Sequence, residues 1–399
     1  MPLKLGAVSE QIEHMAQAMA ALSPAQEQFL EQAQALLRSI PADALRLKLE
    51  QQRQRQVRFP WLVATPHGSL CGAILAHPAP VDFCVIGVDA SSVPPDRHRS
   101  VRFYVLNVGY AALTYGRYAD AVLDAESQLY FRDEDLYLFP EKRDVPIEGT
   151  LLNARMEVES LQTLQEVIQH RAHRSSGERP PIVALRDGPL ILWTLQSEPQ
   201  EVQDKLLYGF LQAMSSLRQS GIPLAGYISY TDSRDVANSL RVWICQESPN
   251  ECEHCKNSKR DLCLALAKIR DRDLFNFLAT GERSELFASS SQILERYGEH
   301  RVDFFYLNVG GEIVRVEVPH WVSADAEWLS LLHAVIYDQS RRSPGFPPYP
   351  PALLEAHEQA VITTTERRLI EEMVERALGL HGQSVLRSAK DDSKRRRGI

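Results

Sequence analysis

The stretch FCVIGVDASS, residues 83–92, decides the fold class that this sequence predicts. An almost continuous apolar run leads to one carboxylate, Asp89, and small polar residues follow it. Such a run is typical of an inner strand, and α/β folds place their functional groups at strand ends. A second run, PIVALRDGP at residues 181–189, ends at Asp187 in the same way. The two strand-end aspartates predict a pair of carboxylates that converge on a metal ion.

The composition is that of an ordinary globular chain without a global basic surface. Of its 399 residues, 44% are hydrophobic and 24% are charged, which allows one large domain or two medium ones. The formal net charge of −8 means that any surface for nucleic acid must be local, such as a groove. The N-terminal residues lack the pattern of a secretory signal, and no run approaches the roughly 18 apolar residues of a membrane span. We therefore expect a cytoplasmic protein without a membrane partner.

Helical and strand patterns alternate along the chain. Residues 9–58 carry apolar residues at helical spacing and predict one or two amphipathic helices, with a break near Ser39-Ile40-Pro41. Strands at 83–89, 102–113 and 127–139 predict an antiparallel meander. Further elements are expected as helices at 151–174, 199–219, 233–243, 324–338 and 350–381, a strand at 224–230, and a hairpin at 301–318. This order predicts an α/β fold in which helices flank a mixed sheet.

Four motifs follow one another in a recognisable order. They are GVDAS at 87–91, RDGPL at 186–190, GYIS at 226–229, and PYP at 348–350 with Ala356-His357. In sequence and order they resemble the NurA nucleases, from residue 83 to the region of residue 380. The resemblance implies an RNase H-like mixed β-sheet flanked by helices. We expect an N-terminal helical region at 1–75, a NurA-like nuclease domain at 76–385 and a disordered charged tail at 386–399.

The resemblance also implies an activity and partners. NurA proteins digest DNA with Mn²⁺, so we expect a DNA nuclease that uses Mn²⁺ or Mg²⁺ to hydrolyse phosphodiester bonds. They act with a hexameric HerA-type translocase, which implies 5′–3′ end processing in double-strand break repair, a HerA-type ATPase partner and a homodimer. The residues themselves do not fix cleavage polarity, strand preference, exonuclease or endonuclease action, or the number of catalytic metal ions.

The resemblance assigns carboxylates to the metal site residue by residue. Asp89 matches the family's first-strand aspartate, and Asp187 matches the aspartate of its Asp-Gly strand. The family also uses a helix glutamate between them, and Glu157 fits that position best, with Glu159 as the alternative. Because these glutamates are two positions apart, they point to different helix faces, and at most one of them reaches the metal. The expected ligands Asp89, Glu157 and Asp187 would hold one or two divalent ions that activate water.

Two C-terminal residues complete the site that the resemblance implies. Tyr349 and His357 match the family's C-terminal tyrosine and histidine. A neutral imidazole at His357 binds metal or handles a proton near the scissile phosphate. Arg341 and Arg342 are candidates for binding the DNA backbone, with a solvated helix end as the alternative interpretation.

A cysteine-rich insert at residues 245–263 predicts a second metal site. Four thiols within it follow the pattern C-x6-C-x2-C-x7-C: Cys245, Cys252, Cys255 and Cys263. Four close thiolates bind structural Zn²⁺ or an iron–sulfur cluster, although the spacing matches neither a zinc ribbon with two C-x2-C steps nor a ferredoxin. His254 is an alternative ligand.

Two other functions compete with the NurA-like interpretation. A cysteine-cluster nuclease of the RecB type would need a Glu-x-Lys step after a strand-end aspartate, and neither Asp89 nor Asp187 has one nearby. A non-enzyme alternative is a metal-stapled module that binds DNA or a protein partner, in which the acids are only structural. Substitution of the two aspartates distinguishes these hypotheses, because only a nuclease depends on them for DNA cleavage.

Overall fold

The computed structural model of this protein describes residues 4–55, 57, 59–96, 101–139, 141–142, 145–174, 180–245, 255 and 259–383. Its contacts group into two compact units. The smaller unit comprises Met1–Leu75, Ser229–Ser290 and Asp303–Arg315. The larger unit comprises Ala76–Ile228, Ser291–Val302 and Val316–Ile399. The sequence did not lead us to expect that two later segments join the N-terminal region in one unit.

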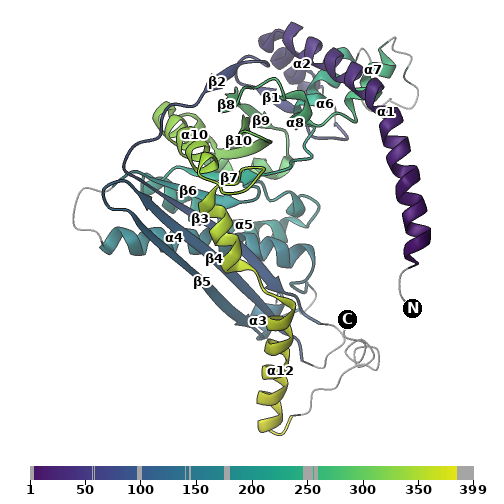
Figure 1. The fold of residues 1–399 in the computed structure, drawn as a ribbon. Coiled ribbons are helices and arrows are strands. Elements are labelled where there is room, and N and C mark those ends of the chain that lie inside the picture. The colour runs from purple at the N-terminus through teal and green to yellow at the C-terminus, as the bar shows by residue number, and fades with distance from the viewer. Residues whose placement is uncertain are drawn as a thin grey trace. The chain divides into compact units, whose positions relative to one another are not determined.

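The larger unit is built on a mixed sheet with β3 near its centre (Figure 1). The strands are β3 (Phe83–Val93), β4 (Tyr104–Tyr115), β5 (Asp120–Tyr130), β6 (Ile182–Asp187) and β7 (Leu224–Ile228). β4 runs antiparallel to β3 and to β5, whereas β6 is parallel to β3 and β7 is parallel to β6. The first six residues of β3 are all buried, as the apolar run predicts for an inner strand.

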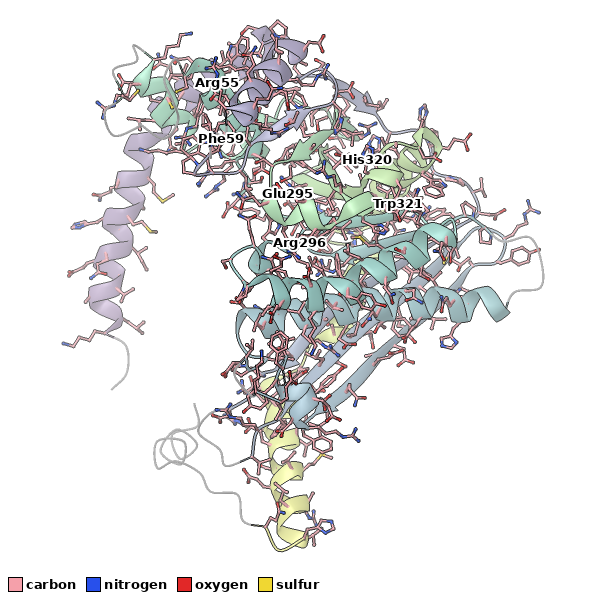
Figure 2. The ribbon with its side chains drawn as sticks, turned by 180° about the vertical axis from the view of Figure 1, so that it is seen from behind. Arg55, Phe59, Glu295, Arg296, His320 and Trp321 are labelled. Atoms are coloured by element: carbon pink, nitrogen blue, oxygen red, sulfur yellow. The ribbon has the colours of Figure 1, made fainter. Side chains whose placement is uncertain are left out.

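Helices cover both faces of this sheet. On one face, α4 (Thr150–Arg174) packs against β3 and against α5 (Gln200–Gln219). On the other face lies α11 (Pro351–Ala360), the yellow-green helix in front of the sheet in Figure 1, which contacts β3 and β4; Figure 2, seen from behind, shows the face that α4 and α5 cover. α5 buries one side through residues at helical spacing, among them Leu206, Phe210 and Leu217. The predicted class, an α/β fold with a mixed sheet flanked by helices, is confirmed.

The third strand of the meander lies earlier than predicted. We expected a strand at 127–139, but β5 ends at Tyr130 and a short helix, α3 (Asp133–Leu136), follows. β5 is an exposed edge strand in which Ala121, Val122 and Leu123 follow one another without alternating with polar residues, so it lacks the apolar pattern of a half-buried strand. The acidic run at 133–135 instead occupies the first turn of α3, where negative charge is favourable.

The predicted helix at 350–381 is two helices. α11 ends at Ala360, and α12 (Thr364–Leu380) begins after three intervening residues. Thr363 caps the second helix, because its hydroxyl accepts from Glu366 N at 3.2 Å while the Glu366 carboxylate accepts from Thr363 N at 2.8 Å. This reciprocal pair is a capping box, and its Thr-x-x-Glu sequence would have revealed the break.

A buried histidine joins shorter elements of the larger unit. His300 ends the 3-10 turn η4 (Gly298–His300), which follows η3 (Gln292–Arg296). Trp321, in α9 (His320–Ser323) and labelled in Figure 2, donates its indole N–H to His300 Nδ1 at 3.1 Å. His300 Nε2 lies 2.8 Å from Ser215 Oγ, whose own hydroxyl donates to Leu211 O. Both ring nitrogens are therefore satisfied by the neutral tautomer that carries its proton on Nε2.

The larger unit contains two further helical elements. They are η1 (Trp193–Leu195) and α10 (Ala326–Arg341). Asp325 caps α10, because its carboxylate accepts from Glu327 N and Trp328 N at 3.0 Å.

The smaller unit combines helices with short strands around an aromatic core. Its helices are α1 (Leu5–Ser39), α2 (Ala42–Gln54), α6 (Asp235–Ile244), α7 (Arg260–Leu266) and α8 (Asp271–Leu274). Its strands are β1 (Ala64–Pro66), β2 (Ala73–Leu75), β8 (Glu282–Ser284), β9 (Phe287–Ser289), most of β10 (Val302–Asn308) and the start of β11 (Ile313–Pro319). Phe275 stacks on Tyr306 with ring centroids 4.8 Å apart. The predicted N-terminal helices are confirmed, with their break at Ile40 and Pro41.

No helix among the described residues is both long enough and apolar enough to span a membrane.

Candidate metal centre

Two neighbouring strands bring the predicted aspartates together. The parallel register pairs Val88 of β3 with Arg186 of β6, so the next residues along the two strands are Asp89 and Asp187. Asp187 ends β6 as predicted, but β3 continues four residues past Asp89 because its other edge stays paired with β4. Asp89 is therefore the first residue beyond the β3–β6 pairing rather than the end of its strand.

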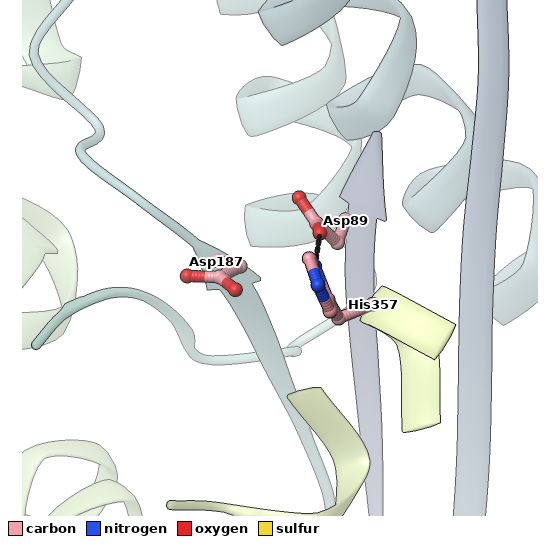
Figure 3. Close-up of side chains that lie close together, drawn as sticks. All are labelled: Asp89, Asp187 and His357. Carbon is pink, nitrogen blue, oxygen red and sulfur yellow. Dashed lines mark hydrogen bonds and ion pairs between the residues drawn. The ribbon is translucent and has the colours of Figure 1, made fainter. Parts of the chain in front are cut away.

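His357 completes a cluster with these two carboxylates (Figure 3). One ligand atom from each of Asp89, Asp187 and His357 lies within 4.8 Å of the others. His357 Nδ1 is 2.7 Å from Asp89 Oδ2, and Asp89 Oδ1 accepts from Ala90 N at 2.7 Å. The His357 side chain is 51% exposed, so the ring is accessible to solvent while one of its nitrogens faces the carboxylate.

Two glycines allow α11 to carry His357 this close to the sheet. A Cβ on Gly87 of β3 would lie 2.3 Å from Ala352 O, and a Cβ on Gly109 of β4 would lie 2.3 Å from Ala356 O. No side chain fits at either position without moving the helix, because real Cβ atoms do not approach this closely. We missed both residues as site determinants, although an isolated glycine in a strand indicates close approach of another backbone.

A buried amide fixes the end of α11. Asn107 of β4 donates from Nδ2 to Gln359 O and Ala360 O, each at 2.9 Å. Its Oδ1 accepts from Ser127 of β5 at 2.7 Å, which sets the orientation of the amide. The last turn of α11, two residues after His357, is thus attached to the sheet. No sequence motif indicated this role for Asn107.

Tyr349 supports the second aspartate. Its hydroxyl donates to Asp187 Oδ1 at 2.7 Å, and its ring meets Tyr227 edge-on at a centroid distance of 5.2 Å. Burial raises the pKa of Asp187, and the charge of Asp89 raises it further, while the Tyr349 hydroxyl opposes both effects. Burial and the nearby Asp187 charge also raise the pKa of Tyr349, so its hydroxyl remains a proton donor. The predicted Tyr349 is therefore next to the cluster.

The predicted glutamates lie on α4 in ion pairs with arginines. Glu157 pairs with Arg186, whose side chain is 4% exposed, and Glu159 pairs with Arg155 at 2.5 Å. Arg186 Nε also donates to Ser160 Oγ at 3.2 Å. Burial lowers the Arg186 pKa to about 10, against the opposing effect of the Asp187 and Asp89 charges. Neither glutamate belongs to the cluster of Asp89, Asp187 and His357.

The predicted phosphate-binding arginines have local partners. Arg342 Nε lies 2.5 Å from Asp338 Oδ2, and its guanidinium sits over the Tyr115 ring, 4.4 Å from the centroid. Arg341 lies 6.0 Å from the centroid of the Tyr337 ring. A role in DNA binding stays a prediction for both residues.

The cysteine-rich insert falls mainly outside the described residues. Cys245 directly follows α6, and Cys263 lies in α7, whereas Cys252 and His254 are outside the described ranges. Cys255 is described, but its neighbours on both sides are not. The four-thiolate metal site therefore stays a prediction.

The part of the chain that carries the cluster matches a known family. Residues 84–362 match the NurA domain, which covers more than two thirds of the chain. This chain belongs to the NurA family. No curated protein matches the sequence. The matched range includes Asp89, Asp187, Tyr349 and His357, so the residues that the NurA motifs assigned all lie within the family domain.

The solved structures that match this chain include NurA proteins. The NurA nuclease from Sulfolobus solfataricus is 12% identical with a TM-score of 0.49, covering 96% of this chain and 98% of that one. A structure of NurA with manganese is 12% identical with a TM-score of 0.34, covering 76% of this chain and 91% of that one. At these identities and scores the likenesses carry no argument about function, and the family assignment depends on the domain match.

Proposed function

We propose that this chain is a divalent-metal-dependent nuclease that hydrolyses phosphodiester bonds in DNA. The observation that carries the proposal is the meeting of Asp89, Asp187 and His357 within 4.8 Å, inside a NurA domain. Two carboxylates and an imidazole form a donor set that suits Mn²⁺, and the carboxylates also suit Mg²⁺. Such an ion, when bound, stabilises negative charge on the phosphate and lowers the pKa of a water molecule.

The neighbouring side chains would orient these donors. Because His357 Nδ1 faces Asp89 Oδ2, its Nε2 is the nitrogen that would bind the metal or hold a proton. The Tyr349 hydroxyl holds Asp187 Oδ1 and thereby directs the rest of that carboxylate. Glu157 is our proposed third carboxylate, with Glu159 as the alternative. Each is paired with an arginine here and would have to leave it to reach the ion.

The finer features of the proposal derive from family membership. We propose 5′–3′ processing of DNA ends in double-strand break repair, a HerA-type hexameric ATPase as partner, and a homodimer. We also propose that Cys245, Cys252, Cys255 and Cys263 hold a structural Zn²⁺ ion or an iron–sulfur cluster. Metal analysis and a visible spectrum of protein purified with and without oxygen distinguish the two, because only the cluster absorbs visible light.

A cleavage assay on end-labelled single- and double-stranded DNA tests the nuclease proposal. The wild-type chain, alone and with a HerA-type ATPase, is incubated with Mn²⁺, Mg²⁺ or EDTA. We expect cleavage with Mn²⁺ and none with EDTA. Asp89→Asn and Asp187→Asn remove one charge each while keeping the side-chain volume, so each is expected to lower the cleavage rate by about a hundredfold or more.

The matched control is Asp124→Asn, which changes an exposed aspartate of β5. It should cleave DNA at the wild-type rate. If both site variants are folded, as judged by circular dichroism and thermal unfolding, and still cleave like the wild type, the catalytic assignment is wrong. If the wild type cleaves under none of these conditions, a binding module without catalysis replaces the nuclease as the better hypothesis.

A further inference from the structure

Tyr230 adopts a backbone conformation that is rare for an aromatic residue. Its φ is 48°, in the left-handed region, and it is the one non-glycine residue with positive φ among those the structure describes. In this region the Cβ atom crowds the following carbonyl oxygen, so glycine or asparagine is the usual occupant. A tyrosine persists there only where its surroundings hold it in place.

Two side chains of the smaller unit hold Tyr230 in this conformation. The Glu312 carboxylate accepts a hydrogen bond from the Tyr230 backbone N–H. The Arg272 guanidinium lies over the ring, with Cζ 3.9 Å from its centroid. One contact fixes the backbone and the other fixes the plane of the ring, so the orientation of the aromatic face is determined by the fold.

The segment after Tyr230 is attached to α8, the helix that carries Arg272. Asp271 N donates to Ser233 O at 2.8 Å, and Arg270 Nε lies 2.9 Å from Asp232 Oδ1. Thr231, which lies between Tyr230 and Asp232 in the sequence, is buried. Because the loop and the helix are joined at several points, the ring and the cation behind it form a pre-organised pair.

The two members of this pair differ in exposure. Tyr230 is 72% exposed, whereas the Arg272 side chain is 11% exposed. Since Arg272 covers one face of the ring, most of the exposed area belongs to the opposite face and the edge. The structure thus buries a cation against a strained tyrosine and still leaves that tyrosine open to solvent.

We propose that Tyr230, backed by Arg272, is a stacking platform for a base of single-stranded DNA. This inference depends on the proposed DNA nuclease function, because a strand-processing enzyme must hold single-stranded segments of any sequence. Aromatic faces stack with every base, so they bind single strands without sequence preference. The exposed residues that follow the ring in its own segment, Asp232 and Arg234, are charged, so this segment presents no apolar side chain beside the ring.

Fluorescence anisotropy with a labelled oligothymidylate in EDTA tests the platform, because binding is then measured without cleavage. Tyr230→Ala is expected to raise Kd about fivefold or more, and Tyr230→Trp, which keeps an aromatic face, should bind within about twofold of the wild type. Tyr118→Ala is the matched control, since Tyr118 is also 72% exposed but has a normal backbone conformation. Its Kd should equal that of the wild type. Unchanged binding by Tyr230→Ala would overturn the platform.

A second variant separates binding from folding. Tyr230→Gly relieves the backbone strain and removes the ring, so it should unfold at the wild-type temperature or above and yet bind DNA as weakly as Tyr230→Ala. Wild-type affinity in this glycine variant would contradict the proposal, as would a wild-type chain that binds no single-stranded DNA. The nuclease proposal fails on a different measurement, since a wild type that binds but never cleaves refutes the nuclease and leaves the platform intact.

Discussion

Each site aspartate has a carboxylate oxygen engaged by a neighbouring side chain. Asp89 Oδ2 faces His357 Nδ1, and Asp187 Oδ1 accepts from the Tyr349 hydroxyl. These contacts fix the direction of both carboxylates before any ligand binds, which lowers the cost of assembling a metal site. At the proposed metal site, we therefore expect the side chains around the aspartates to affect metal affinity as well as folding.

Tyr349→Phe tests this role at the scale of one hydroxyl. The substitution keeps the ring against Tyr227 but removes the donor to Asp187. We expect a higher Mn²⁺ concentration for half-maximal cleavage and a roughly tenfold lower kcat/KM. Removing a side chain that hydrogen-bonds to a metal ligand typically lowers metal affinity or activity by about 10- to 100-fold. Tyr208→Phe is the control, since Tyr208 is 66% exposed on α5. An unchanged Mn²⁺ dependence in Tyr349→Phe would show that the hydroxyl does not orient the site.

The sequence motifs single out residues that the structure brings together, but they do not predict the contacts that these residues make. Asp89, Asp187 and His357 are far apart in the chain, yet the structure brings all three together. The pairing of Glu157 with Arg186 could not be anticipated, because it depends on which face of β6 meets α4. Alternation along a strand places Arg186 and Asp187 on opposite faces, but it does not say what each face contacts.

At the scale of elements, the approach of α11 to the sheet determines where His357 lies. Gly109→Ala should disrupt this approach, because the added methyl would lie 2.3 Å from Ala356 O and 2.4 Å from Ala360 N. We expect a loss of about 1–3 kcal/mol of unfolding free energy from overpacking, and a fall in cleavage activity as His357 moves. Both quantities are measured on the same preparation, by urea unfolding and by the DNA cleavage assay.

Gly379→Ala is the matched glycine control for this experiment. Gly379 lies in α12, and an added Cβ would meet nothing within 4 Å. Alanine favours a helix over glycine by about 1 kcal/mol, so this variant should be as stable as the wild type or slightly more stable, with normal activity. If Gly109→Ala had the same free energy of unfolding and the same cleavage activity as Gly379→Ala, the close approach of α11 to the sheet would not be needed for the site.

The elements that the sequence predicted correctly are those with a strong apolar pattern. β3, β6 and β7 carry near-continuous apolar runs, and the structure has strands at all three. β5 was misplaced because an exposed edge strand has no buried face to give it a pattern. The boundary between α11 and α12 was missed because both helices share one amphipathic period, and only the cap at Thr363 separates them.

At the scale of the whole chain, the division into two units was beyond the reach of sequence patterns. The smaller unit is assembled from three separate segments, and its aromatic core joins residues as distant as Leu37 and Phe304. Local periodicity describes each segment by itself and contains no information about which segments share a core. The larger unit was more predictable, because its strands and helices alternate in the order that a mixed α/β sheet requires.

The buried His300 predicts how the stability of the chain responds to pH. Burial lowers its pKa below the ordinary value of 6.5, and Trp321 and Ser215 both satisfy the neutral ring. As pH falls, the imidazole of His300 is therefore protonated in the unfolded state before it is protonated in the folded state. The contribution of His300 to the free energy of unfolding is thus present above pH 6.5 and is lost as pH falls below it. Urea unfolding at pH 7.5 and pH 5.5 should show a decrease in the wild type that is smaller in His300→Gln, which cannot titrate. Equal decreases in the two proteins would mean that His300 titrates normally in the folded state and that its hydrogen bonds do not favour the neutral form.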